Sequence, residues 1–123
     1  MSYNPRKVGI MRRVRPIQFP HDPLVTDAVA LGVAIRAARS HSGLTLSEAA
    51  VSLGISKQTL SNLETGKGSV GLDTVLRAAR ELGVSLFAVP AAEREPVRRA
   101  IQTLGVLHFS PSQTAEGKDG CLP

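Results

Sequence analysis

The chain has 123 residues, of which few are aromatic and one is a cysteine. Aromatic side chains make up 3% of it and tryptophan is absent, so we expect an aliphatic core. The single cysteine, Cys121, cannot form an internal disulfide, which fits a reducing cytoplasm. No apolar run approaches the roughly 20 residues of a membrane-spanning helix, and the basic N-terminus lacks the apolar stretch of a signal peptide. We therefore expect a cytoplasmic protein that does not bind a membrane.

The residue sets of common active sites and metal sites are also missing. We find no Ser/His/Asp set, no paired carboxylates and no Walker-type phosphate loop, so we expect no catalytic residues and no enzyme activity. His21, His41 and His108 are scattered and have no second ligand at metal-binding spacing. We therefore expect neither a metal nor another cofactor.

Positive charge is concentrated at the N-terminal end. The formal net charge is +5, and residues 1–20 contain five basic and no acidic residues, whereas the rest of the chain is balanced. We interpret residues 1–23, which hold four prolines, as a basic extended arm. Arg12 and Arg13 in this arm are candidates to contact DNA phosphates or a minor groove, the alternative being a solvated tail that only aids solubility. Both Met1 and Met11 are possible starts of translation.

Apolar residues at spacings of three and four predict several helices. We expect them from near Thr26 to about 40, over 44–53, over 57–65, over 72–82 and over 93–104. The expected inward residues are Ala28, Leu31, Ile35 and Ala38 in the first helix, and Leu72, Val75, Leu76, Ala79 and Leu82 in the fourth. The fold class is therefore all-α, with four to five helices. We divide the chain into the arm over 1–23, a helix-turn-helix domain over 24–90, a C-terminal helix and extension over 91–109, and a disordered tail over 110–123.

Residues 84–89, which precede Pro90, are typical of a short strand because they are apolar or small. A lone strand in a helical domain has unpaired edges. We therefore expect it to pair, either with the same strand of a second subunit or with residues 14–19. In a dimer, Leu86, Phe87 and Val89 would form the interface.

The run from Gly43 to Gly66 is typical of a helix-turn-helix, in which two short helices are joined by a tight turn. Gly54 is suited to end the first helix and Ser56 to cap the second. Lys57 can reach guanine O6 and N7, and Gln58 can bind adenine N6 and N7. The alternative is an ordinary solvated helix face. The candidate DNA-binding residues are Thr45, Ser47, Ser56, Lys57, Gln58, Thr59, Ser61, Asn62, Lys67 and Ser69.

The chain resembles the lambda-repressor/Cro-type (XRE) helix-turn-helix family over about residues 27–89. The resemblance implies a structural ion pair between Arg39 and Glu64 that joins the first and third helices. One position departs from the family, because Leu46 stands where a glutamine usually contacts a phosphate and supports the recognition helix. The matching residues are Arg39, Gly43-Leu44-Thr45, Ala50, Leu53-Gly54-Ile55-Ser56, Leu60-Ser61 and Glu64-Thr65-Gly66.

Within this family the chain is most similar to HipB-type proteins. The similarity lies in the run from Ser61 to Glu64, the run from Leu72 to Leu76, and the expected strand at 85–89. It implies a homodimeric regulator, expected to be a repressor, that binds double-stranded operator DNA. The alternative is a HipB-like antitoxin that neutralises a HipA-like kinase toxin and autoregulates its operon.

Overall fold

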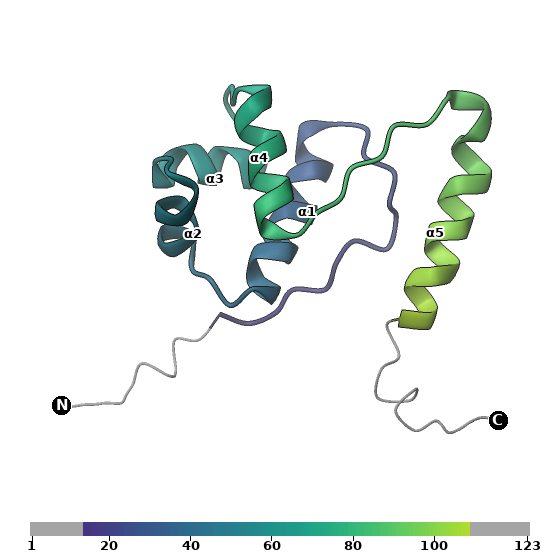
Figure 1. Ribbon diagram of the computed structural model, residues 1–123, viewed down its shortest axis with the longest axis horizontal. Coiled ribbons are helices and arrows are strands. Elements are labelled where there is room, and N and C mark those ends of the chain that lie inside the picture. The colour runs from purple at the N-terminus through teal and green to yellow at the C-terminus, as the bar shows by residue number, and fades with distance from the viewer. Residues whose placement is uncertain (1–13, 109–123) are drawn as a thin grey trace, which may run out of the picture. The chain divides into compact units, whose positions relative to one another are not determined.

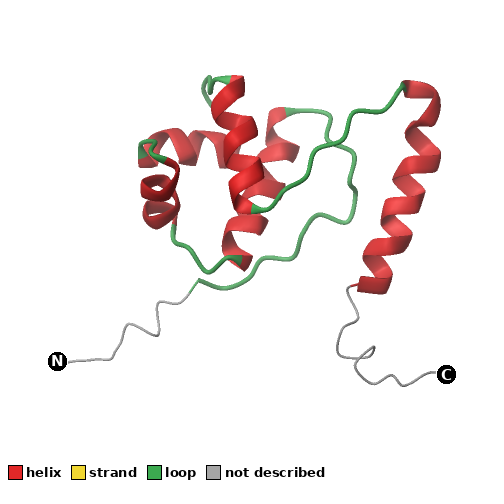
Figure 2. Ribbon diagram, in the orientation of Figure 1, coloured by secondary structure: helices red, strands yellow, loops and turns green. Residues whose placement is uncertain are grey.

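The computed structural model describes residues 14–108, so the predicted contacts of Arg12 and Arg13 and the predicted tail over 110–123 lie outside the described residues. In this range the chain forms α1 (Ala28–His41), α2 (Leu46–Leu53), α3 (Lys57–Thr65), α4 (Leu72–Leu82), the 3-10 helix η2 (Ala91–Glu93) and α5 (Arg94–His108) (Figure 1). Residues 14–108 contain no strand, which makes the described chain all-α (Figure 2). They divide into two compact units, 14–20 with 25–86 and 21–24 with 87–108.

The helices of the first unit begin at side chains that cap them. The Asp27 side chain accepts a hydrogen bond from the backbone N–H of Ala30 at 2.8 Å, so Asp27 caps α1, which begins at Ala28, two residues after the predicted start near Thr26. A carboxylate at this position also interacts favourably with the positive end of the helix dipole. Helix α2 begins two residues later than predicted because Thr45 is its cap.

The turn between α2 and α3 depends on Gly54 and Ser56. Gly54 adopts φ 71° and ψ 31°, a left-handed conformation that glycine reaches without the steric cost of a side chain. Ile55 then donates its backbone N–H to Ala50 at 3.0 Å. The Ser56 hydroxyl accepts the backbone N–H of Thr59 at 2.9 Å and starts α3. Gly54 thus ends α2 and Ser56 caps α3, as predicted, and this short connection fixes the direction in which α3 leaves α2.

The first unit has an aliphatic core made largely of alanine. Ile35 and Leu60 are its largest fully buried side chains, and Leu53, Leu63 and Leu82 pack around them. Seven of the 13 buried apolar residues are alanines on α1, α2 and α4. Alanine lets helices approach closely, but each one removes little apolar surface from water. The core therefore relies on close helix contacts more than on large side chains.

Two helix faces differ from the predicted ones. Ala28 is exposed, because it stands at the first residue of α1, before that helix reaches the core. On α4 the side chains of Leu72 and Leu76 are 71% and 42% exposed, and the buried residues are Ala78, Ala79 and Leu82. The buried face of α4 therefore centres on Ala78, Ala79 and Leu82, and is rotated about the helix axis from the face that the sequence predicted. Leu72 and Leu76 remain as apolar residues that this single chain leaves uncovered.

The predicted strand over 84–89 is not formed in this chain, since residues 84–90 have no regular secondary structure. Its pairing with residues 14–19 is wrong for a specific reason. The backbone N–H of Ile17 donates to Ser40 Oγ at 2.7 Å, and the Ile17 carbonyl accepts from His41 Nε2 at 2.9 Å. These side chains of α1 occupy the groups that a strand partner would need. Pairing with a second subunit stays a prediction.

In the second unit, an acidic residue before α1 is tied to α5. Arg98 donates two hydrogen bonds to the carboxylate of Asp22 and one, from Nη1, to Glu95 Oε2 at 3.0 Å. Asp22 Oδ1 also accepts the backbone N–H of Leu24 at 3.0 Å. These bonds hold residues 21–24 against α5. No helix within residues 14–108 combines the length and apolarity needed to cross a membrane.

The Asp22 contact makes the second unit sensitive to acid. The Leu24 N–H, and after it Arg98, hold the pKa of Asp22 below the ordinary value of 3.8. A lowered pKa stabilises the folded state fully above pH 3.8, and this stabilisation is lost as the pH falls through the lowered pKa. In an NMR titration we expect Arg98→Gln to raise the pKa of Asp22. The pKa should still stay below 3.8 because the Leu24 bond remains.

The matched control for this titration is Arg99→Gln. Arg99 lies 3.9 Å from Glu95, and the hydrogen bonds to Asp22 among the described residues come from Leu24 and Arg98, so this variant should leave the Asp22 titration unchanged. Equal Asp22 pKa values in the wild type and in Arg98→Gln would contradict the prediction.

Candidate nucleic-acid interface

Helices α2 and α3 are positioned by a buried ion pair that reaches across the first unit. Arg39 on α1 donates from Nε to Glu64 Oε2 at 2.6 Å and from Nη2 to Oε1 at 2.9 Å. Its Nη1 donates to the backbone carbonyl of Leu44 at 2.8 Å. The structure thus contains the pair that the resemblance implied, in a bidentate geometry that also fixes the loop between α1 and α2.

Helix α1 also touches α3 through its backbone. A Cβ atom placed on Gly32 would lie 2.5 Å from the carbonyl oxygens of both Leu63 and Glu64, which is closer than real Cβ contacts come. Gly32 is therefore the point at which the two helices meet without a side chain between them. This role of Gly32 was not predicted, because the sequence around a glycine inside a helix does not indicate which residues lie opposite it.

The N-terminus of α2 is closed by a capping box. The Thr45 hydroxyl accepts the backbone N–H of Glu48 at 3.1 Å, and Glu48 Oε1 accepts the backbone N–H of Thr45 at 2.9 Å. The Thr45-x-x-Glu48 spacing is a recognised signal for this arrangement, although only the threonine was singled out from the sequence. Thr45 and Ser47 are both exposed here, beside a carboxylate that a phosphate would have to approach.

The outer side of α3 is polar and partly ordered by its own side chains. Lys57 and Gln58 are exposed, whereas Thr59, Ser61 and Asn62 are half-buried. Gln58 Nε2 donates to Asn62 Oδ1 at 3.0 Å. The hydroxyl groups of Ser56 and Thr59 lie 2.7 Å apart, so the first turn has one hydroxyl pair in addition to its backbone cap.

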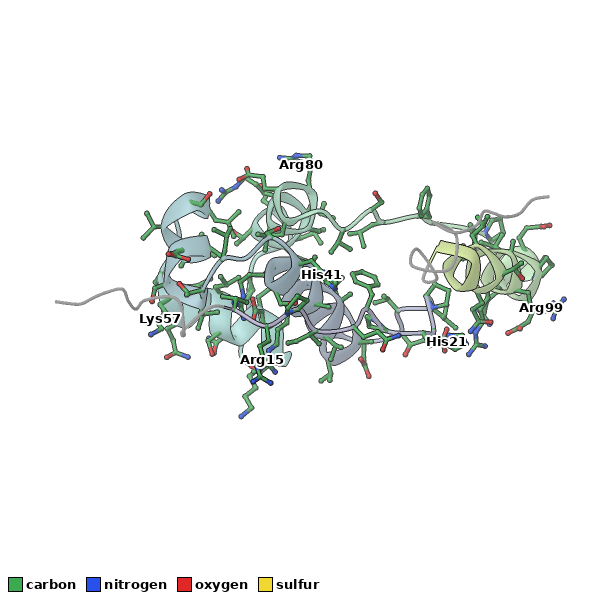
Figure 3. The ribbon with its side chains drawn as sticks, turned by 90° about the horizontal axis from the view of Figure 1, so that it is seen from below. Arg15, His21, His41, Lys57, Arg80 and Arg99 are labelled. Carbon is green, nitrogen blue, oxygen red and sulfur yellow. The ribbon has the colours of Figure 1, made fainter. Side chains whose placement is uncertain are left out.

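Exposed basic residues, one of them within the arm, add positive charge to the first unit. Lys67 and Ser69 are exposed in the loop after α3, and Arg15 is exposed before α1. Figure 3 shows Lys57 and Arg15 on the same side of the ribbon in that view, with Arg80 of α4 on the opposite side. The predicted residues from Thr45 to Ser69 thus belong to one unit.

The bonds between Ile17 and the end of α1 were not expected from the sequence. They hold the extended segment over 14–20 to the helix that also carries Arg39. Arg15 is two residues from this attachment. No local pattern marks such a contact, because it joins residues 23 and 24 positions apart.

Among residues 14–108 no group of three or more histidine, cysteine, aspartate or glutamate side chains is placed to hold a metal ion. The buried charges, Arg39 and Glu64, neutralise each other and face the core. The exposed polar groups of α3 are instead suited to hydrogen-bond with a ligand outside the fold.

Two short helices, a glycine turn and an exposed polar second helix define a helix-turn-helix DNA-binding domain. Residues 35–89 match the family model described as helix-turn-helix, so this part of the chain is an XRE-type helix-turn-helix domain. The function that follows at this level is DNA-binding transcriptional regulation.

Several solved structures are similar to part of the chain. A chain of "MDT Protein" is 28% identical with a TM-score of 0.49, over 55% of this chain and 96% of that chain. A chain of the "HipA-HipB-O2-O3 complex" is 26% identical with a TM-score of 0.49, over 55% and 96%. The clp gene regulator ClgR from Corynebacterium glutamicum is 26% identical with a TM-score of 0.43, over 80% and 97%. No curated protein matches the chain.

Proposed function

We propose that this protein is a homodimeric repressor that binds a near-palindromic operator through α3. The observation that carries the proposal is the exposed face of α3, where Lys57 and Gln58 stand at the N-terminal end of a helix capped by Ser56. In helix-turn-helix proteins this end of the second helix meets the base edges. Lysine suits guanine and glutamine suits adenine, and the other predicted residues, from Thr45 to Ser69, suit phosphates and flanking bases.

The contacts that hold α3 in place agree with a role in base recognition. Base readout requires side chains held in a fixed position relative to the rest of the domain. Helix α3 is fixed by the bidentate pair between Arg39 and Glu64 and by the backbone contact at Gly32. Its polar face thus projects from a rigid support. The basic arm that holds Arg12 and Arg13 would add phosphate contacts that do not depend on sequence.

Selection of bound duplexes from a random pool tests the proposal. The full-length protein should enrich a short palindrome with half-sites about 34–36 Å, or a multiple of that, apart. The variant Lys57→Ala/Gln58→Ala should lose the palindrome while retaining salt-dependent binding to any duplex. Arg80→Ala is the matched control, since it removes one positive charge from the opposite side of the unit as drawn in Figure 3. A wild-type protein that enriches no sequence would overturn the proposal.

The dimer would form through the apolar residues that a single chain leaves uncovered. Phe87 is 78% exposed, and Leu86 and Val89 are about equally half-uncovered. Leu72 and Leu76 on α4 are a second uncovered apolar set. Large apolar side chains left exposed are candidates for a protein interface. We propose that residues 84–89 become a strand only on pairing with a second copy, which supplies the backbone groups that this chain lacks.

Phe87→Asp tests the dimer. Because Phe87 is exposed in the single chain, a charge at this position should not destabilise the monomer. At the centre of the dimer interface, however, it should halve the mass in solution and weaken operator binding. Light scattering and titration of the selected duplex measure the two effects. Val33→Asp, at an exposed valine on α1 outside the proposed interface, is the control. Unchanged mass and unchanged affinity in Phe87→Asp would exclude strand pairing.

The second candidate is a HipB-like antitoxin. It rests on the similarity of the Ser61–Glu64 and Leu72–Leu76 runs to HipB-type proteins. In this function the protein would neutralise a HipA-like kinase and use its DNA binding to regulate its own operon. Co-purification of a kinase with the tagged protein from its own cells, and inhibition of that kinase in vitro, would favour the antitoxin. An operator without any such kinase partner would favour the stand-alone repressor.

A further inference from the structure

The amide of Gln58 is held by a second amide one turn further along α3. Gln58 Nε2 donates to Asn62 Oδ1 at 3.0 Å, across the four-residue spacing at which helix side chains meet. Gln58 is exposed and Asn62 is half-buried, so the more enclosed side chain supports the freer one. Without this bond, a glutamine side chain with three rotatable bonds would sample many orientations in solvent.

Asn62 is itself held in place by the loop that follows α3. Its backbone carbonyl accepts the N–H of Lys67 at 2.9 Å. A Cβ atom on Gly68 would lie 3.1 Å from Asn62 Nδ2, so the loop passes close to the amide with no side chain between them. The backbone of this loop therefore limits the positions open to Asn62.

Neighbouring residues offer Gln58 little other support. The hydroxyl groups of Ser56 and Thr59 are paired with each other. Leu46, in the first turn of α2, is apolar and packs against the core, so its side chain has no group to bond with an amide. Among residues 14–108, the side-chain hydrogen bond that supports Gln58 comes from within α3.

We propose that Asn62 is a positioning residue for base recognition, which orients the Gln58 amide toward adenine. The bond uses one N–H of Gln58 and leaves its carbonyl oxygen and its second N–H free. These are the acceptor and the donor that adenine N6 and N7 require. The inference rests on the proposed function, and it assigns Asn62 a role through Gln58 in place of a phosphate contact of its own.

The test measures base discrimination on the duplex that the wild-type protein selects. The base pair read by Gln58 is the one at which Gln58→Ala loses its preference among the four bases. At that position Asn62→Ala should reduce the preference for adenine by about tenfold, the order of magnitude that a bidentate contact supplies. Affinity for an unrelated duplex should stay within about twofold, since phosphate contacts dominate that affinity.

Two further variants separate positioning from general damage to the helix. Asn62→Asp keeps an acceptor for Gln58 Nε2 and should retain the preference, although its charge should weaken binding to every duplex alike. Thr65→Ala removes the side-chain bonds of Thr65 to the backbone of α3 and has no contact with Gln58, so it should change nothing in the preference.

The double variant Gln58→Ala/Asn62→Ala decides between positioning and direct contact. If Asn62 acts through Gln58, the double variant should discriminate no worse than Gln58→Ala alone. An unchanged preference in Asn62→Ala, or an additional loss in the double variant, would overturn the inference while the proposed function stands. A wild-type protein that selects no duplex would overturn both.

Discussion

Gly32→Ala is expected to destabilise the first unit by about 3 kcal/mol, which reverses the usual effect of this substitution. In the interior of a helix, alanine normally stabilises by about 1 kcal/mol over glycine. At Gly32 the new methyl group would lie 2.5 Å from the backbone oxygens of Leu63 and Glu64, and backbone atoms cannot swing aside as a side chain can. Helices α1 and α3 would have to separate, which also lengthens the bonds between Arg39 and Glu64.

Urea unfolding followed by helical circular dichroism measures this effect. Gly71→Ala is the matched control, because a Cβ on Gly71 meets nothing within 4 Å and its φ of -59° suits any residue. The control should lower the free energy of unfolding by no more than about 1 kcal/mol, because alanine is a poorer N-cap than glycine but meets no clash here. A Gly32→Ala protein as stable as the wild type would show that the two helices are not in close contact at this point.

Glu64→Ala is expected to cost about 3–5 kcal/mol, because it leaves the Arg39 guanidinium buried without a counter-charge. The Arg39 and Glu64 side chains are only 11% and 5% exposed, so water cannot replace the lost partner without opening the core. Glu64→Gln should cost less, since its amide oxygen can still accept one of the two bonds. The free energy of unfolding in urea again provides the measurement.

The control for this pair is Glu81→Ala on α4. Glu81 is exposed, and no ion pair joins it to another described residue, so its loss should lie within about 0.5 kcal/mol. A change in melting temperature of under a degree or two in Glu64→Ala would count against a stabilising pair. Arg39→Met/Glu64→Leu should recover most of the loss, because removing both charges removes the unpaired one.

The sequence was most informative where structure is set by neighbouring residues. The bounds of α3 and α4 and the roles of Gly54 and Ser56 follow from capping and turn signals within a few positions. The all-α class and the family follow from the same local pattern. The assignment of individual residues to DNA contact stays a prediction, because a polar helix face and a DNA-binding face have the same composition.

Other features depend on contacts between distant parts of the chain. The attachment of Ile17 to Ser40 and His41 removed one of the two partners considered for residues 84–89. The exposure of Leu72 and Leu76 reflects how α4 is rotated about its axis on the core. The spacing of apolar residues does not determine this rotation, because the apolar stripe of a helix is wide. The close approach at Gly32 is likewise invisible in the local sequence.

The alanine-rich core has a consequence for how stability varies with temperature. The heat capacity change of unfolding rises with the apolar surface that unfolding exposes. Because seven of the 13 buried apolar residues are alanines, this surface is small for a domain of this size. We therefore expect a shallow stability curve with broad melting and weak cold destabilisation. The first unit would keep a nearly constant free energy of unfolding over a wide range of growth temperatures.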